Sequence, residues 1–96
     1  MIITIVRFRS GLPEGEVLRV SEERAPRYRE VEGLVQKYYL RYPETGEYGA
    51  VYVWNSEEDL QAFRDSDLVR TIPDVYRIEG ELGLERADVV LELRSK

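Results

Sequence analysis

The order in which strand-like and helix-like segments follow one another constrains this chain more than any other feature. Residues 34–42 and 47–54 are rich in β-branched and aromatic residues, and the turn sequence at 43–46 (Pro-Glu-Thr-Gly) separates them, so we expect a β-hairpin. A segment with helical character lies on each side of this hairpin, and further strand-like segments lie beyond both. The order β-α-β-β-α-β predicts a ferredoxin-like α+β fold, with a four-stranded antiparallel sheet and both helices on one face.

The first half of the chain supplies the first strand and the first helix of this order. Residues 2–8 are apolar and β-branched, which favours a strand. Apolar residues follow a nearly helical spacing over 13–31, but Pro26 interrupts this segment, so we expect a kink or two helical pieces. Gly33 is available for a left-handed conformation where the helical segment ends.

The second half begins with a helix start at Ser56, which is followed three residues later by Asp59. Residues 75–82 are expected to form the next strand, and residues 83–86 a turn. Apolar and polar residues alternate over 87–94, which predicts a C-terminal fifth strand. Nothing in the 96 residues resembles a linker or a repeat, so we expect a single domain over residues 1–96.

Two residue types are missing from the sequence, and their absence excludes several kinds of chemistry. The chain contains no histidine and no cysteine. It therefore cannot form a Ser-His-Asp triad, a thiol nucleophile, a disulfide or a histidine-ligated metal centre. Acidic residues cluster at 57–59, where a helix start explains them better than a metal site does, so we expect no metal.

The charge and hydropathy of the chain limit its partners. The net charge is −5 and the arginines are scattered among acids, which argues against nucleic acid as a partner. No apolar run is long enough to span a membrane, and no basic segment precedes the apolar start of the chain, so we expect no membrane partner and no signal peptide. A cytoplasmic location is the default expectation.

A ferredoxin-like sheet leaves one face without helices, and alternation along the strands predicts which residues lie there. Small aliphatic residues, including Val51 and Val53, share one side of their strand and are expected beneath the helices. A lysine beneath helices would be costly, so we place the side bearing Lys37 on the uncovered face. The expected uncovered face consists of Lys37, Tyr39, Ala50, Tyr52 and Trp54.

Such an aromatic face is too apolar to be left in water by a monomer. We therefore expect a two-fold homodimer in which two sheets pack face to face, forming a dimeric α+β barrel. The fifth strand would extend or cover the sheet edge of the partner. Each half would keep a pocket between its own sheet and helices or within the barrel.

With this pattern the chain resembles the dimeric α+β barrel superfamily that includes the antibiotic-biosynthesis monooxygenases, and most closely the YdhR-type monooxygenases. The residues that carry the resemblance are Glu32–Lys37, Gly49–Asn55 and the helix start at Ser56–Phe63. They match a "G-L-x-x-K" start of the second strand and a "G-x-x-Y-x-aromatic" third strand. Together with the order of the elements, the likeness covers nearly the whole chain.

The resemblance implies a homodimer with a hydrophobic pocket for an aromatic or polyphenolic molecule, and an oxygenation that needs no cofactor. Lys37 would stabilise a substrate enolate or phenolate, and Tyr39 would donate a hydrogen bond. Tyr52 and Trp54 would stack on the substrate ring, and Asn55 would orient it. The haem-degrading members of the superfamily use a histidine ligand that this chain lacks, so haem degradation is not expected.

Simpler interpretations of the same residues stay open at this point. The aromatic residues are also typical of core or dimer packing, and Lys37 could be an ion-paired surface lysine. Asn55 fits equally well as a turn residue after a strand. The alternatives to an enzyme are a non-catalytic dimeric module that binds or senses a ligand, and a structural dimer whose pocket is filled by side chains.

Overall fold

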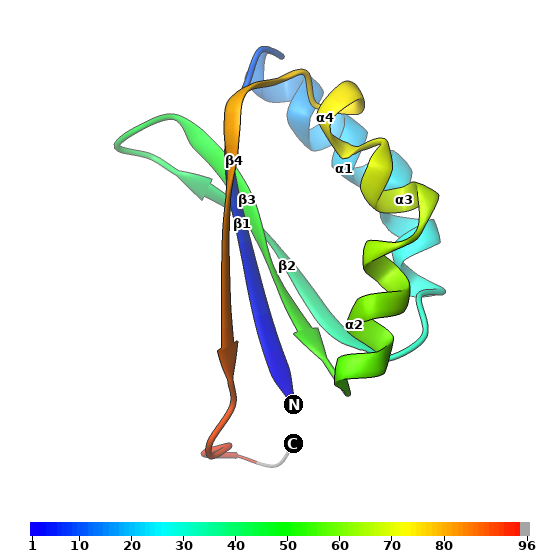
Figure 1. Ribbon diagram of the computed structural model, residues 1–96. Helices are drawn as coiled ribbons and strands as arrows, with labels where there is room; N and C mark the ends of the chain where they lie inside the picture. The colour runs from blue at the N-terminus through cyan, green and yellow to red at the C-terminus, as the bar shows by residue number, and fades with distance from the viewer. Residues whose placement is uncertain (95–96) are drawn as a thin grey trace.

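The computed structural model describes residues 1–94, which form an antiparallel sheet with helices over one of its faces (Figure 1). The four strands in the described part have the order β2-β3-β1-β4 across the sheet. They are β1 (Ile2–Ser10), β2 (Leu34–Tyr42), β3 (Glu47–Trp54) and β4 (Ile78–Asp88). The helices are α1 (Glu14–Arg29), α2 (Glu57–Arg64), α3 (Asp67–Arg70) and α4 (Ile72–Val75). The predicted ferredoxin-like α+β fold is confirmed.

Local sequence signals explain where several of these elements begin and end. The β2–β3 turn is closed by the amide of Gly46, which donates to the carbonyl of Tyr42 at 2.8 Å, and Gly46 has a φ of 77° that favours glycine. At the start of α2 the hydroxyl of Ser56 accepts from the amide of Asp59 and donates to its carboxylate. The hairpin and the predicted helix start are therefore confirmed.

The first helical segment is one continuous helix, so of the two alternatives expected at Pro26 the division into two helical pieces is wrong. Pro26 lies inside α1, close to its end at Arg29. The carbonyl that loses its amide partner there is that of Glu22, which is an exposed residue. The proline is tolerated because it lies in the last turn and leaves no buried acceptor unpaired.

The predicted turn at 83–86 and the predicted fifth strand at 87–94 are also wrong. β4 runs without a turn from Ile78 to Asp88, with Gly83 opposite Arg7 of β1. The amide of Val89 still donates to the carbonyl of Met1 at 3.0 Å, but β1 begins there and offers no further partner. The alternating C-terminal residues consequently lie beyond the sheet, and the side chains of Val90, Leu91 and Leu93 are at least four-fifths exposed.

The prediction of which sheet face meets the helices is wrong as well. The register pairs Lys37 with Tyr52 and Tyr39 with Ala50, so these residues do share a face, but that face lies beneath the helices. Val51 and Val53, expected there, point to the other side. The large aromatic residues of β3, Tyr52 and Trp54, are almost completely buried there, so they and not the valines fill the space between the two layers.

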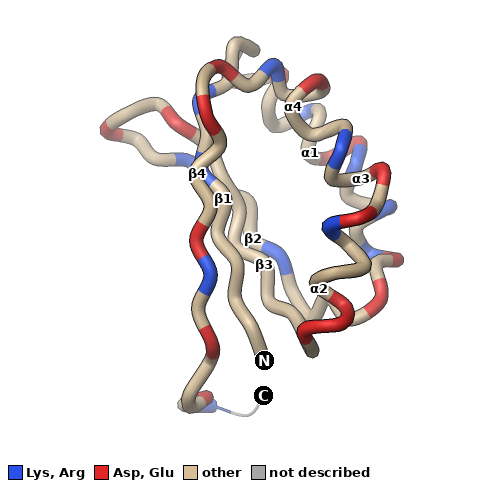
Figure 2. Tube along the Cα trace, viewed as in Figure 1, with Lys and Arg blue, Asp and Glu red and all other residues tan. Residues whose placement is uncertain are grey.

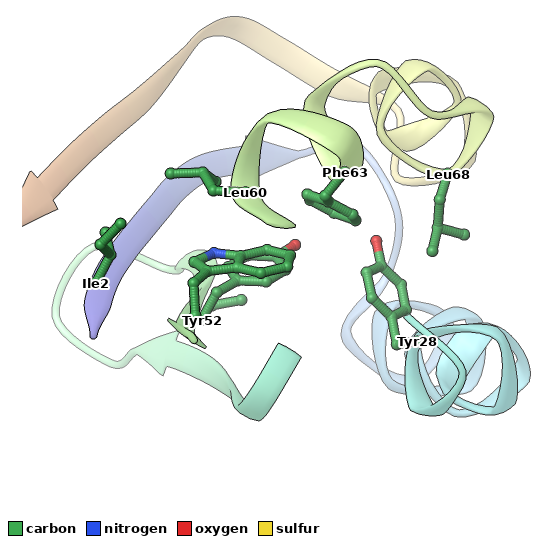
Figure 3. Close-up of a cluster of buried hydrophobic side chains, with 8 residues drawn as sticks. Ile2, Tyr28, Tyr52, Leu60, Phe63 and Leu68 are labelled. Atoms are coloured by element: carbon green, nitrogen blue, oxygen red, sulfur yellow. The ribbon is translucent and has the colours of Figure 1, made fainter. Parts of the chain in front are cut away.

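The buried residues form two clusters between the layers. The larger one joins β1 and β3 to α1, α2 and α3, and Figure 3 shows Tyr28 of α1 and Leu68 of α3 pointing toward one another beside Phe63 of α2. Its buried members are Ile2, Tyr28, Ala50, Tyr52, Trp54, Leu60, Phe63 and Leu68. The smaller cluster contains Phe8, Val17, Val20 and Tyr76. Packing at both ends of the helical layer thus holds it on the sheet.

Charged residues of both signs are interspersed along the helices and along β4 (Figure 2). Among the ion pairs, Arg86 of β4 bonds to Glu57 at the start of α2 and so ties the sheet edge to the helical layer. Both side chains are well exposed, so this pair stabilises the fold only weakly. Among residues 1–94, no helix is long and apolar enough to cross a membrane.

We predict that Gly33→Ala destabilises the protein more than Gly46→Ala does. Both glycines have positive φ, 81° and 77°, but an added Cβ at Gly33 would also collide with the side chain of Asp59, whereas the space around Gly46 is open. The φ penalty alone is about 1–2 kcal/mol, and the collision adds to it at Gly33. Urea denaturation measures both free energies of unfolding.

Gly15→Ala is the matched control, because Gly15 lies in α1 with open space around it. Alanine there should leave stability unchanged or raise it by up to about 1 kcal/mol. Equal losses at Gly33 and Gly46 would show that the contact with Asp59 does not constrain the entry to β2.

Candidate functional site

A cleft of about 570 Å³ lies between α1 and the sheet, within the size range of small-molecule sites. β1, β2 and β3 supply its floor, α1 supplies one wall, and Ile72 and Tyr76 close one end. Most of the side chains that line it are apolar or aromatic. The cleft exists because the two buried clusters do not meet completely, and members of both border it.

Lys37 is the one lysine of residues 1–94, and its amine lies among three tyrosine rings on the cleft wall. Its Nζ is 3.3 Å from the ring centroid of Tyr28, 4.3 Å from that of Tyr39 and 4.7 Å from that of Tyr52. Among residues 1–94, no carboxylate forms an ion pair with Lys37. The amine is therefore held by ring faces and not by an opposite charge.

This environment changes the acidity of the amine. Burial, together with the nearby positive charge of Arg24, lowers the pKa of Lys37 to about 7. The ring faces favour the ammonium form and oppose these two effects. Near neutral pH the lysine is thus available both as a base and as a cation.

Two of the tyrosines beside Lys37, Tyr39 and Tyr52, stay protonated over the same pH range. Burial raises the pKa of Tyr39 to about 12 and raises that of Tyr52 well above its usual value. Burial also raises the pKa of Tyr76, whose hydroxyl forms a 2.7 Å hydrogen bond with the hydroxyl of Ser21 on α1. The cleft therefore offers neutral phenols as hydrogen-bond donors beside a titratable amine.

Arg24 is a second cation behind the wall formed by Tyr28. It is 9% exposed, and its guanidinium carbon lies 6.0 Å from the centroid of the Tyr28 ring. One of its terminal nitrogens donates to the carbonyl of Leu68 at 2.7 Å, whereas its Nε has no partner among residues 1–94. Arg24 thus joins α1 to α3 and adds positive charge to the site.

An ion pair crosses the mouth of the cleft. Arg41 near the end of β2 donates to the carboxylate of Glu14 at the start of α1 at 2.7 Å. Both side chains are more than half exposed, so the pair is easily opened and contributes little to stability. Glu14 is also the one carboxylate among the residues that line the cleft, and this pairing leaves the inner cleft without negative charge.

The structure brings three of the five sequence-predicted site residues together. Lys37, Tyr39 and Tyr52 all line the cleft. Trp54 is completely buried beneath them, with its ring 5.9 Å from that of Tyr52 and nearly parallel to it, and its indole N–H donates to the hydroxyl of Thr4. Asn55 is exposed after β3, and its backbone amide donates to the carbonyl of Gly33. Trp54 and Asn55 are thus outside the lining of the cleft.

Sequence reasoning missed the contribution of α1 to the site. Ser21, Arg24 and Tyr28 lie on one stripe of this helix and are buried, although two of them are polar or charged. The stripe is visible in the sequence as a helical spacing from Val17 to Tyr28. A polar residue on a buried helical stripe is the signal that could have directed attention to these positions.

The part of the chain that the structure describes, residues 1–94, contains no cluster of three or more acidic, histidine or cysteine residues that could hold a metal ion. Apart from the carboxylate of Glu14, which is paired with Arg41, and the hydroxyl of Ser21, the polar side chains of the cleft are cations and phenols. Cations and phenols are poor ligands for hard divalent cations. The chemistry available to this site is accordingly that of an amine, several phenols and an apolar cavity.

Comparison with known proteins supports the fold. The sequence matches no known family and no curated protein. Solved structures of similar fold include a candidate antibiotic biosynthesis monooxygenase from Deinococcus radiodurans, with a TM-score of 0.78, 11% identity, and coverage of 100% of this chain and 99% of that one. A second candidate monooxygenase, from Caulobacter crescentus, has a TM-score of 0.78 and 17% identity, and the match covers 94% of this chain and 90% of that one.

A third similar structure is SnoaB from Streptomyces nogalater, a cofactor-independent oxygenase. Its TM-score is 0.71 at 19% identity, and the match covers 94% of this chain and 95% of SnoaB. At such identities the likeness concerns the fold alone. The chain therefore has the fold of the antibiotic biosynthesis monooxygenases, and the YdhR-type likeness stays a prediction.

We predict that Lys37 loses its proton with a midpoint near pH 7, as burial and Arg24 require. The chain has only two lysines, so protein labelled with ¹³C-lysine gives two side-chain signals, and Lys96→Arg assigns them. Arg24→Met should raise the pKa of Lys37, because it removes a like charge. A Lys37 signal that titrates near its ordinary value of about 10.4 would contradict this.

Proposed function

We propose that this protein binds an aromatic or polyphenolic molecule in the cleft and oxidises it with dioxygen, as a cofactor-independent monooxygenase. The observation that carries the proposal is Lys37, an amine without an ion-pair partner among residues 1–94 on the wall of an aromatic cleft. The fold shared with SnoaB and with the candidate monooxygenases supports the same reaction class.

The reaction needs a base first and a cation afterwards, and Lys37 would serve as both. Its neutral amine takes a proton from an acidic position of the substrate, and the ammonium so formed stabilises the resulting enolate or phenolate. Tyr39 donates a hydrogen bond to the same oxygen, and Tyr52 contacts the ring. The roles of Trp54 and Asn55 would be indirect, through support of Tyr52 and of the chain after β3.

The deprotonated substrate supplies the electrons. When one dioxygen molecule oxidises a ring methylene to a carbonyl, the substrate gives up four electrons. One oxygen atom enters the product and the other is released as water. An anthrone is the type of substrate that can follow this course. The protein has only to bind, orient and deprotonate it, and to exclude water from the anion.

The shared fold and the resemblance also support a homodimer, built on the helix-free face of the sheet. Ile3, Ile5, Val51 and Val53 lie there and are only partly buried within one chain. Tyr38 of β2 lies on the same face and is 57% exposed. The apolar C-terminal residues beyond β4 would lie along the partner, because no strand of their own sheet extends far enough to pair with them.

We expect oxygen uptake when the protein is mixed with anthrones or polyphenols. Lys37→Met should lower turnover by about 100-fold or more, since it removes both the base and the charge. Lys37→Arg should keep substrate binding but lose turnover at neutral pH, because arginine stays protonated. The wild-type rate should rise with pH through about 7, as the amine of Lys37 loses its proton.

Tyr38→Phe is the matched control, because Tyr38 is on the same strand but points away from the cleft. Ligand binding that shifts thermal stability without oxygen uptake would indicate a non-catalytic binding module instead. If the panel gives neither ligand binding nor oxygen uptake, both proposed functions are overturned and only the structural dimer remains.

We predict that the protein sediments as a dimer, and that Val51→Glu shifts it to monomers by placing a charge in the apolar face. Ala62→Glu, on the exposed side of α2, is the control and should leave the dimer intact. Analytical ultracentrifugation measures the mass, and circular dichroism checks that both variants fold. A wild-type protein that stays at 11.3 kDa at all concentrations would refute the dimer.

A further inference from the structure

The use of lysine at position 37 is unusual for this chain. It has twelve arginines and two lysines, and arginine occupies the other described sites where a cation lies over a ring, namely Arg7 over Tyr42 and Arg24 over Tyr28. Arginine is the commoner partner for such contacts, but it cannot lose its proton in a protein. Lysine, unlike arginine, can provide a neutral amine at this position.

The surroundings of Lys37 favour that neutral form on geometric grounds. The charged and titratable groups that face it are Arg24 and Tyr28 from α1, Tyr39 from β2 and Tyr52 from β3. None of them is a carboxylate. An amine that is desolvated in an apolar pocket beside another cation is the environment in which lysine becomes a nucleophile.

Small molecules can reach the amine. Lys37 lines the main cleft and also a second hollow of about 340 Å³, and Tyr28 and Tyr39 line both. The backbone amide of Lys37 donates to the side chain of Gln36, but no hydrogen bond is formed by its Nζ within residues 1–94. The lone pair of the neutral amine is therefore not engaged by any group of residues 1–94.

We propose that Lys37 is an imine-forming residue that condenses with the aldehyde or ketone group of an aromatic ligand in the cleft. Its Nζ attacks the carbonyl carbon, the C–N bond forms, and the carbonyl electron pair moves to oxygen. One proton then moves from the nitrogen to that oxygen, which gives a carbinolamine. The hydroxyl then leaves as water, with a proton supplied from the neutral phenol of Tyr39, and the C=N bond forms. The nitrogen proton returns to Tyr39, so nothing is oxidised or reduced.

This inference concerns the same cleft as the proposed oxygenation but does not depend on dioxygen. An amine with a pKa near 7 is about half neutral at pH 7, whereas an ordinary lysine is neutral in roughly one molecule in two thousand. A difference of that size makes Lys37 far more reactive toward carbonyl compounds at pH 7 than a lysine with an ordinary pKa.

The test is reductive trapping with benzaldehyde and cyanoborohydride under argon at pH 7, followed by intact-mass measurement and peptide mapping. We expect an adduct at Lys37 that forms at least tenfold faster than any adduct at Lys96, and faster than any adduct at the N-terminal amine. Lys96→Arg should keep the adduct and Lys37→Arg should lose it. Mapping the adduct in the wild-type protein does not depend on how the variants fold.

Labelling only at Lys96 or at the N-terminal amine, or no labelling at all, would overturn the inference. The two proposals for this cleft can fail separately. Trapping at Lys37 without oxygen uptake would support imine formation and refute the oxygenase function. Oxygen uptake without trapping would support the oxygenase function and refute imine formation.

Discussion

The stacked pair of Tyr52 and Trp54 decides how the rest of the molecule is arranged. The indole N–H of Trp54 donates to the hydroxyl of Thr4 at 3.1 Å, which satisfies the one polar atom of a side chain that water does not reach. Phe63 of α2 packs against both rings, with centroids 5.5 and 5.0 Å away. This cluster fixes which face of β3 meets the helices and, through the register, places Lys37 beneath them as well.

The cleft follows from the way the core is divided. The aromatic cluster fills one end of the space between the layers, and the smaller cluster around Phe8 and Tyr76 fills the other. The hydrogen bond between Ser21 and Tyr76 holds α1 at the second end, and the bond from Arg24 to Leu68 holds it at the first. α1 is thus supported on both sides of the cleft, which allows an open space between them without loss of the fold.

The sequence predicted elements well where the signals are local. The bounds of β2 and β3, the turn at Gly46 and the capping of α2 by Ser56 depend on neighbouring residues and were correctly predicted. The prediction of a C-terminal strand was wrong, because whether Val90 and its neighbours form a strand depends on where β1 begins. The residues 87–94 themselves do not encode that position. The alternation of side chains along the strands correctly placed Lys37, Tyr39 and Tyr52 on one face of the sheet. It cannot tell which face of the sheet the helices cover. The contribution of Tyr28 and Arg24 depends on the packing of α1 across the sheet, a relation that no local pattern contains.

The corrected faces change the relation between assembly and binding. The sequence suggested that one aromatic face would serve both the dimer and the ligand, so that packing and binding would compete for the same residues. In the structure, Tyr38 points to the helix-free face, whereas Lys37 and Tyr39 on either side of it point to the cleft. The proposed dimer face and the proposed ligand site are therefore separated by one residue along β2. Because the sheet lies between them, the apolar face can be buried against a second copy while the amine of Lys37 keeps its access to the cleft.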